Sequence, residues 1–195
     1  LSLHDALPIC LIDFDQLAAD AVVAGGRLWI TFEDSLIEMD MDGNIVNTYL
    51  AGSGATSLYA TPEGVWVALV GDGAFVRRFD FATSSFDSPI KLSDTSDQII
   101  SLDGLDEDHR LWVALNRDNL LFQLDSLTGD VIGEIRTSDL PLDIEVYEDL
   151  VFVAARGASE INVFDAKQGN FLSSIDKIDN PDSLIVEPCG ENCAK

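Results

Sequence analysis

Several polar residues share one position relative to short apolar segments of the chain, and their side chains could bind a cation. Two positions before the first apolar strand residue stand Asp20, Thr56, Asp97 and Asp182. If the segments are equivalent strands around one centre, the carboxylates converge, and carboxylate oxygens are ligands that Ca²⁺ prefers. We therefore predict a metal site at Asp20, Asp97 and Asp182, with Ca²⁺ as the candidate cofactor. The alternative is that these residues cap loops or pair with Arg117 and Arg156.

Asp143 departs from this pattern. It stands one residue nearer to its apolar segment than the four residues above. Successive side chains of a strand point to opposite faces of the sheet, so we expect Asp143 to face away from the cation site.

The cysteines offer a second kind of chemistry. They are Cys10, Cys189 and Cys193, and the last two enclose the short segment Gly190–Asn192. A disulfide between Cys189 and Cys193 would staple this turn and would imply an oxidising compartment, periplasmic or extracellular. Free thiols or half of a metal site are the alternatives, although two thiolates do not complete a zinc shell. The spacing is not that of a haem attachment motif.

Catalytic chemistry has little support in the sequence. The histidines are His4 and His109, and His109 lies in an acidic segment with no nucleophile motif beside it. No nucleophile elbow, zinc-protease helix, phosphate loop or dinucleotide fingerprint occurs. We therefore predict no catalytic residue within this chain, and the enzyme class stays open because an active site could lie in sequence outside it.

The charge of the chain restricts its partners. It has 35 acidic against 11 basic residues, a formal net charge of −24. Nucleic acid requires a basic surface, so it is excluded as a partner, and adsorption to anionic membranes is disfavoured. No apolar run approaches the roughly 18 residues of a membrane helix, so we expect no direct membrane insertion in this segment. Solubility explains the acidity most simply, and a cationic partner is the alternative.

The apolar segments belong to a repeat. An apolar triplet centred on an aromatic recurs at Leu28–Ile30, Val65–Val67, Leu111–Val113 and Val151–Val153. An Asp closes the next apolar run each time, at Asp40, Asp80, Asp125 and Asp165. With a further run on each side, every unit holds four short strands in about 40 residues, the period of a β-propeller blade. The third unit is longer, and we expect residues Asp103–Arg110 to lengthen the turn between its first two strands.

The repeated residues have structural explanations. The aromatics Trp29, Trp66, Trp112 and Phe152 are expected to fill the space between neighbouring blades, where a large flat side chain buries the most area. Each closing Asp is expected to accept hydrogen bonds from turn amides. The Gly that follows in three of the four units supplies the positive φ that such loops require.

The repeat resembles that of YVTN-type propellers, which are related to NHL and quinoprotein-like repeats. Pro141–Val146, Leu111–Ala114 and Leu124–Gly129 carry the resemblance, which extends over residues 20–186. It implies an all-β fold: a β-propeller fragment of about four four-stranded antiparallel blades plus partial flanking strands. The expected blades are residues 17–53, 54–94, 95–139 and 140–179, with the start of a further blade at 180–195.

Residues 1–9 resemble one reading frame of a DNA-sequencing adapter, so we assign the single, incomplete domain to residues 10–195. The leading functional hypothesis is a non-enzymatic binding or scaffold module that presents its loop face to a protein or small-molecule ligand. Propellers also host other functions. The alternatives are a metal-dependent lactonase or lyase with catalytic residues mostly in missing blades, and the sensor domain of a larger signalling protein.

Overall fold

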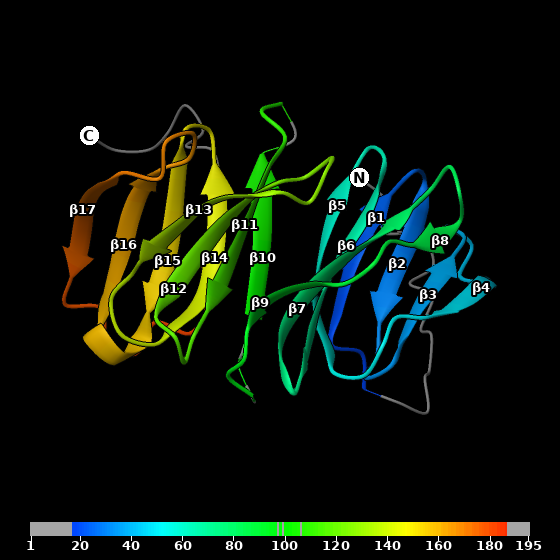
Figure 1. The fold of residues 1–195 in the computed structure, drawn as a ribbon, viewed down its shortest axis with the longest axis horizontal. Coiled ribbons are helices and arrows are strands. Elements are labelled where there is room, and N and C mark those ends of the chain that lie inside the picture. Colours follow the sequence, from blue (N-terminus) through cyan, green and yellow to red (C-terminus); the bar gives the residue numbers. More distant parts are fainter. Residues whose placement is uncertain (1–16, 97, 99, 106, 187–195) are drawn as a thin grey trace, which may run out of the picture.

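The computed structural model describes residues 17–186 except 97, 99 and 106, and these residues form four antiparallel sheets, A to D (Figure 1). Sheet A contains β1 (Asp20–Ala24), β2 (Arg27–Thr31), β3 (Ser35–Met39) and β4 (Ile45–Leu50). Sheet B contains β5 (Ala55–Thr61), β6 (Gly64–Gly71), β7 (Gly73–Asp80), β8 (Ser85–Phe86) and β9 (Ile90–Ser93).

Sheet C contains β10 (Ile100–Leu105), β11 (Arg110–Leu115), β12 (Leu120–Asp125) and β13 (Val131–Arg136). Sheet D contains β14 (Pro141–Tyr147), β15 (Leu150–Ala155), β16 (Glu160–Asp165) and β17 (Phe171–Asp176), with a 3₁₀ turn at Arg156–Ala158. Sheets A, C and D are four-stranded meanders of sequence neighbours, and in sheet B the short strands β8 and β9 both pair with β7 in the place of a fourth strand. This arrangement confirms the all-β prediction of four-stranded blades. Within the described residues, no helix has the length and apolarity needed to cross a membrane.

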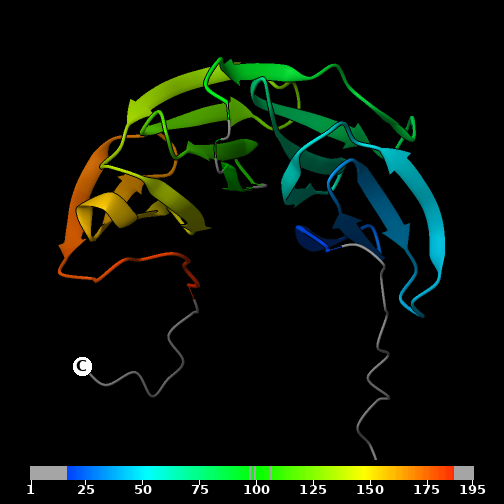
Figure 2. The ribbon, with the colours of Figure 1, turned by 90° about the horizontal axis from the view of Figure 1, so that it is seen from below.

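The sheets stand side by side around an open arc (Figure 2). Their first strands contact one another in chain order, β1 with β5, β5 with β10 and β10 with β14, so they line the inside of the arc. The fourth strands lie on the outside and are mostly exposed, as β4 and β17 show. Strands in the middle, such as β6 and β11, are buried on both faces because a neighbouring sheet covers each face.

The aromatic residue of the second strand is the centre of each contact between sheets. Trp66 of sheet B and Trp112 of sheet C are buried, and their indole N–H groups donate to the carbonyls of Ser126 (3.1 Å) and Ala166 (3.2 Å) in the next sheet. Trp29 instead packs against Phe81 of sheet B, with the ring centroids 5.2 Å apart. The expected packing role of the three tryptophans is confirmed.

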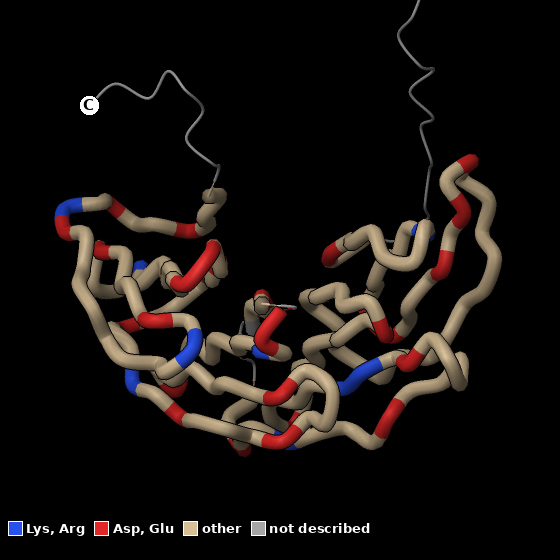
Figure 3. Tube along the Cα trace, turned by 90° about the horizontal axis from the view of Figure 1, so that it is seen from above, with Lys and Arg blue, Asp and Glu red and all other residues tan. Residues whose placement is uncertain are grey.

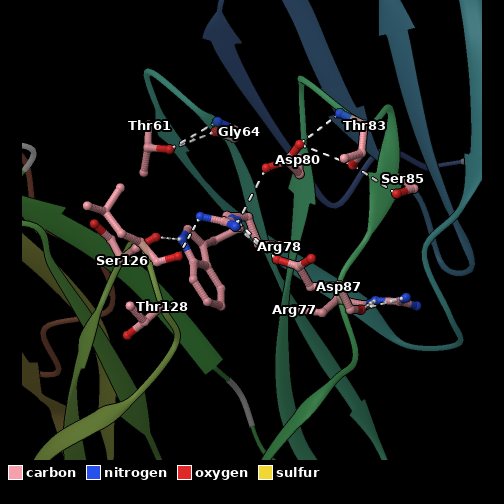
Figure 4. A network of polar contacts seen from close by, with 12 residues as sticks. Thr61, Gly64, Arg77, Arg78, Asp80, Thr83, Ser85, Asp87, Ser126 and Thr128 are labelled. Carbon is pink, nitrogen blue, oxygen red and sulfur yellow. Dashed lines mark hydrogen bonds and ion pairs between the residues drawn. The ribbon is translucent and has the colours of Figure 1, made fainter.

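A polar side chain reinforces two of these contacts. Arg78 on β7 donates to the carbonyl of Leu127 in sheet C (2.7 Å) and pairs with Asp87 of its own sheet (3.1 Å) (Figure 4). At the equivalent position of β12, Gln123 donates to the carbonyls of Ala166 (3.0 Å) and Lys167 (3.3 Å) in sheet D. The third strands of sheets B and C are thereby hydrogen-bonded to the turn of the sheet that follows each of them.

The closing aspartates take part in turns, as predicted. Asp125 Oδ1 accepts the amides of Leu127 and Thr128, both at 2.9 Å. Asp165 does the same for the two amides that follow Ala166, and Asp40 and Asp80 accept amides of their own turns. Hydrogen bonds from the Thr128 amide, above all, hold the pKa of Asp125 below its usual value.

The insertion in the third unit is only partly where the sequence predicted it. In sheet D, Asp143 pairs with Ala154, eleven residues on, whereas in sheet C, Ser101 pairs with Ala114, thirteen residues on. Half of the Asp103–Arg110 segment is strand, because β10 extends to Leu105 and β11 begins at Arg110. The remaining extra length lies in the outer part of sheet B, where Asp87–Pro89 separates β8 from β9.

Gly129 is expected to be indispensable to the contact between sheets B and C. Its φ is +80°, and a Cβ atom there would lie 2.6 Å from Ile90 Cδ1 and 3.3 Å from the Trp66 ring. We expect Gly129→Ala to lower the free energy of unfolding by about 1–3 kcal/mol, measured by urea denaturation.

Gly133→Ala is the matched control, because its Cβ would meet only Gln123, at 3.8 Å or more, and its φ is not positive. Alanine there should leave stability unchanged or raise it slightly. Equal losses in the two variants would contradict a specific role for Gly129.

Candidate functional site

The inner strands carry the polar residues that the sequence singled out, and strand pairing fixes which of them are equivalent. In every sheet, the residue two positions after the aromatic of the second strand pairs with a polar residue of the first strand. In sheets A, B, C and D these first-strand residues are Asp20, Ser57, Ser101 and Asp143, respectively. Asp143 therefore occupies the position of Asp20, so the expectation that it faces away from Asp20 is wrong. Relative to Thr56, Asp143 does stand one residue further along the strand, as expected. Asp20 is equivalent to Ser57, so the predicted alignment of Asp20 with Thr56 is also one residue out.

The error has a simple physical origin. Ala21 pairs with Ile30, just as Leu58 pairs with Val67 and Ile144 with Val153. Ala21 therefore fills the position of a large apolar residue, but its small side chain does not mark the start of the strand in a hydrophobic pattern.

These inner carboxylates connect one sheet to the next. Asp20 Oδ2 accepts the Leu58 amide of sheet B at 2.8 Å. Asp143 accepts the Ser101 hydroxyl of sheet C at 2.9 Å and, through its other oxygen, the Leu184 amide at 2.7 Å. Asp20 thus accepts an amide from within β5, whereas the alternative to metal binding was the capping of a loop.

The remaining predicted ligands do not join Asp20 within the described residues. Asp182 forms an ion pair with Arg156 (3.2 Å), the other alternative to metal binding. Asp97 lies outside the described residues, so the three-residue Ca²⁺ site stays a prediction. In the part of the chain that the structure describes, no three His, Cys, Asp or Glu side chains are grouped to hold a metal. Cys10, Cys189 and Cys193 also lie outside it, so the disulfide is likewise untested.

Asp103 is a buried carboxyl group that the sequence did not single out. It pairs with Trp112 across β10 and β11 and accepts the Val146 amide of sheet D at 2.5 Å. Burial raises its pKa to about 7, although hydrogen bonds from the Val146 and Gly104 amides oppose this rise, and the charges of Glu145 and Asp143 add to it. Burial also raises the pKa of Glu145. Asp103 thus changes charge near neutral pH.

A cleft opens beside Asp103 at the end of the sheets that carries the first-to-second and third-to-fourth strand turns, here called the turn face. It has a volume of about 630 Å³, and its lining comes from three sheets: Tyr59, Gly104, Leu105, Glu107, Asp108, Glu148, Asp149 and Lys167. Acidic residues occur along the whole arc, including its inner side (Figure 3).

Lys167 is the cation of the cleft. Its Nζ lies 2.9 Å from Asp149 Oδ1 of sheet D and 3.4 Å from Asp108 Oδ2 of sheet C. The hydrogen bond to Asp149 is the main cause that raises the pKa of Lys167, and Asp108 adds to it. The Lys167 side chain is 53% exposed, so this ammonium remains accessible to solvent and to a competing ligand.

Two local features shape the cleft. Gly104 is needed where β10 meets sheet B, because a Cβ there would lie 2.9 Å from the Tyr59 ring and 2.3 Å from the carbonyl oxygen of Arg110. The hairpin that supplies Glu107 and Asp108 is the one lengthened by two residues in sheet C. His109 is exposed in that hairpin.

Comparison with known proteins identifies the fold and no family. No family model matches the chain, and no curated protein matches it in sequence. Among solved structures it is similar to a functionally unknown protein from Desulfotomaculum acetoxidans, with a TM-score of 0.76 and 13% identity over 90% of this chain and 61% of that one. The WD40 repeats of RRP9 give a TM-score of 0.71 and 11% identity over 85% and 55%.

AztD of Citrobacter koseri is also similar, with a TM-score of 0.63 and 17% identity over 84% of this chain and 48% of that one. The chain thus spans about half to three fifths of the length of the solved structures that it resembles. The likeness is one of fold, and it supports the propeller architecture.

Replacing Asp103 by Asn is expected to remove a pH-dependent loss of stability. The folded-state pKa of about 7 lies above the ordinary 3.8, so protonated Asp103 stabilises the fold below about pH 4, and this contribution is lost as the pH rises through 7. Asn keeps an acceptor for the Val146 amide. We expect D103N to exceed wild type in unfolding free energy by roughly 2–4 kcal/mol at pH 8 and to match it near pH 4, measured by urea denaturation.

Asp125→Asn serves as the control of opposite sign. The pKa of Asp125 is lowered, so its carboxylate stabilises the fold above the ordinary pKa, and the substitution should bring no gain at pH 8. An advantage of D103N that was the same at pH 4 and pH 8 would show that titration of Asp103 is not its cause.

Proposed function

We propose that this chain is a binding module that holds a basic segment of a protein partner in the cleft of the turn face. The observation that carries the proposal is the composition of the cleft, which is lined by four acidic residues from two neighbouring sheets and one lysine, with two of the carboxylates paired to its ammonium group. A concave site with charges of one sign favours and orients a ligand of the opposite sign. The formal net charge of −24 attracts such a partner from a distance.

The fold is compatible with this role. Propellers place variable turns on a rigid frame, and such turns often carry the binding residues. The solved WD40 repeats of RRP9 share the architecture of this chain. Within that architecture we assign the repeat to the YVTN type, on the strength of Leu111–Ala114 and Leu124–Gly129.

Lys167 indicates the kind of group that the cleft accepts. Its ammonium reaches across the boundary between sheets C and D to carboxylates of both. A lysine or arginine of a partner can make the same two ion pairs once Lys167 moves aside, and half-exposed ion pairs of this type cost little to separate. Lys167 therefore acts as an internal competitor of the partner.

Removal of the two carboxylates that hold Lys167 tests the site. We expect Asp108→Asn with Asp149→Asn to weaken binding of an octalysine peptide about fivefold, because two exposed ion pairs are lost. Isothermal titration calorimetry of the 195-residue chain measures the effect. The control is Asp42→Asn with Asp130→Asn, which removes the same charge from other turns of the same face. Equal weakening in both double variants would mean that the peptide responds to total charge and not to the cleft.

Lys167→Met should have the opposite effect on the same measurement. It removes the internal competitor and keeps a side chain of similar length, so we expect octalysine to bind about threefold or more tightly. Lys177→Met removes the same charge from the segment that follows sheet D, outside the cleft, and should change affinity less. Unchanged or weaker binding by Lys167→Met would contradict competition at this site.

A further inference from the structure

The contact between sheets B and C and the contact between sheets C and D each contain an apolar socket of the same kind. In each, the turn Gly of the following sheet lies over a tryptophan and an isoleucine of the preceding one: Gly129 over Trp66 and Ile90, and Gly169 over Trp112 and Ile135. The strand register places Phe152 and Ile175 at the same positions of sheet D, since Phe152 pairs with Glu145 as Trp112 pairs with Asp103, and Ile175 pairs with Ile161 as Ile135 pairs with Leu121.

On sheet D this socket is more open than on sheets B and C. Trp66 and Trp112 are 2% and 0% exposed, whereas Phe152 is only half-buried and Ile175 is 47% exposed. Sheet D also lacks polar reinforcement, because Val163 stands where Arg78 and Gln123 donate hydrogen bonds to the next sheet. The socket of sheet D is therefore apolar.

The last described residues already follow the path of a first strand. The Leu184 amide donates to Asp143 Oδ2 at 2.7 Å, just as the Leu58 amide of β5 donates to Asp20 Oδ2 at 2.8 Å. The Val186 amide also hydrogen-bonds Glu145, in the manner of the Val146 amide with Asp103. Residues 183–186 thus lie against sheet D in the place that the first strand of a fifth sheet would take.

We infer that the outer face of sheet D is the docking surface for a fifth four-stranded sheet of the same repeat. Its first strand is residues 183–186, and its other strands come later in the same polypeptide, after a first-to-second strand turn longer than those of sheets A to D. The third-to-fourth strand turn of this sheet has the form Asp-x-x-x-Gly, so that its glycine lies over Phe152 and Ile175. The fifth sheet would make with sheet D the same contact that sheet C makes with sheet B and sheet D with sheet C. This contact does not depend on the proposed function.

A second copy of this chain fits the socket less well. The turn of sheet A closes between Asp40 and Asn44, whereas the turns that fill the sockets of sheets B and C close one residue later, between Asp125 and Asp130 and between Asp165 and Asn170. In addition, residues 183–186 already lie where β1 of another copy would have to dock. The occupant is therefore a sheet with the longer turn and not sheet A of a neighbour.

The test begins with the coding sequence that follows the codon of Lys195 and continues with the protein extended by it. We expect the second strand of the sheet to be centred on an aromatic residue and its third strand to be followed by an Asp-x-x-x-Gly turn. Both should occur within roughly 40 residues, one repeat period. In the extended protein, Ile175→Asp should lower the Tm by roughly 5 °C or more, and in the 195-residue chain by much less, because only the extended protein buries this side chain.

Ile132→Asp is the matched control, because Ile132 is equally exposed (47%) but belongs to the outer strand of sheet C. It should change the Tm little in either protein. A stop codon or non-repeating sequence after Lys195, or an equal effect of Ile175→Asp at both lengths, would overturn the inference. A dimer of the 195-residue chain in light scattering that Ile175→Asp abolishes would also overturn it, in favour of a second copy as occupant.

Discussion

The structure depends on one contact, in which the aromatic residue of one sheet packs against the third-to-fourth strand turn of the next. A single four-stranded meander exposes two faces and cannot bury the large side chains of its middle strands alone. Stacking of the sheets buries Trp66 and Trp112 and fixes the distance between neighbours, because the turn glycine leaves no room for a Cβ atom. The curvature of the arc and the position of every turn follow from repetition of this contact.

The same contact explains what the sequence could predict. Residue types that recur at each socket appear at regular spacing in the sequence. For this reason the aromatic triplets, the closing aspartates and the glycines predicted the four sheets and the turns. Trp29 shows the limit of that approach. Its sheet has the aromatic, but sheet B replaces the turn glycine with Ser84 at a φ of +50°, and Phe81 stacks on the indole. The pattern predicts that a socket exists and not which side chains fill it.

The candidate site was harder to predict because it depends on strand register across sheets. Asp20 was aligned one residue out because Ala21 does not mark the start of β1 in a hydrophobic pattern, and a shift of one residue reverses the orientation of a side chain. As a result Asp20 and Asp143, which are equivalent, were expected to face opposite ways. Asp103 and Lys167 did not stand out, because nothing in their sequence neighbourhood shows that Val146 or Asp149 lies beside them. Alignment of the four units on their aromatics, instead of on the first apolar residue, would have placed Asp143 correctly and identified Asp103 as an inner residue.

The acidic residues have different functions at the turns, on the inner strands and in the cleft, although in the sequence they appear only as an excess of negative charge. At the turns, Asp125 and Asp165 accept backbone amides and stabilise the loops that fill the sockets. On the inner strands, Asp20 and Asp143 connect successive sheets through amides. The acids that contact Lys167, like Asp182 beside Arg156, are held by exposed ion pairs that a ligand can replace. Carboxylates that accept backbone amides are committed to the fold, so the surface available for binding is much smaller than the net charge of −24 implies. That distinction, more than the charge itself, is the reason why we propose the cleft as the site of a basic partner.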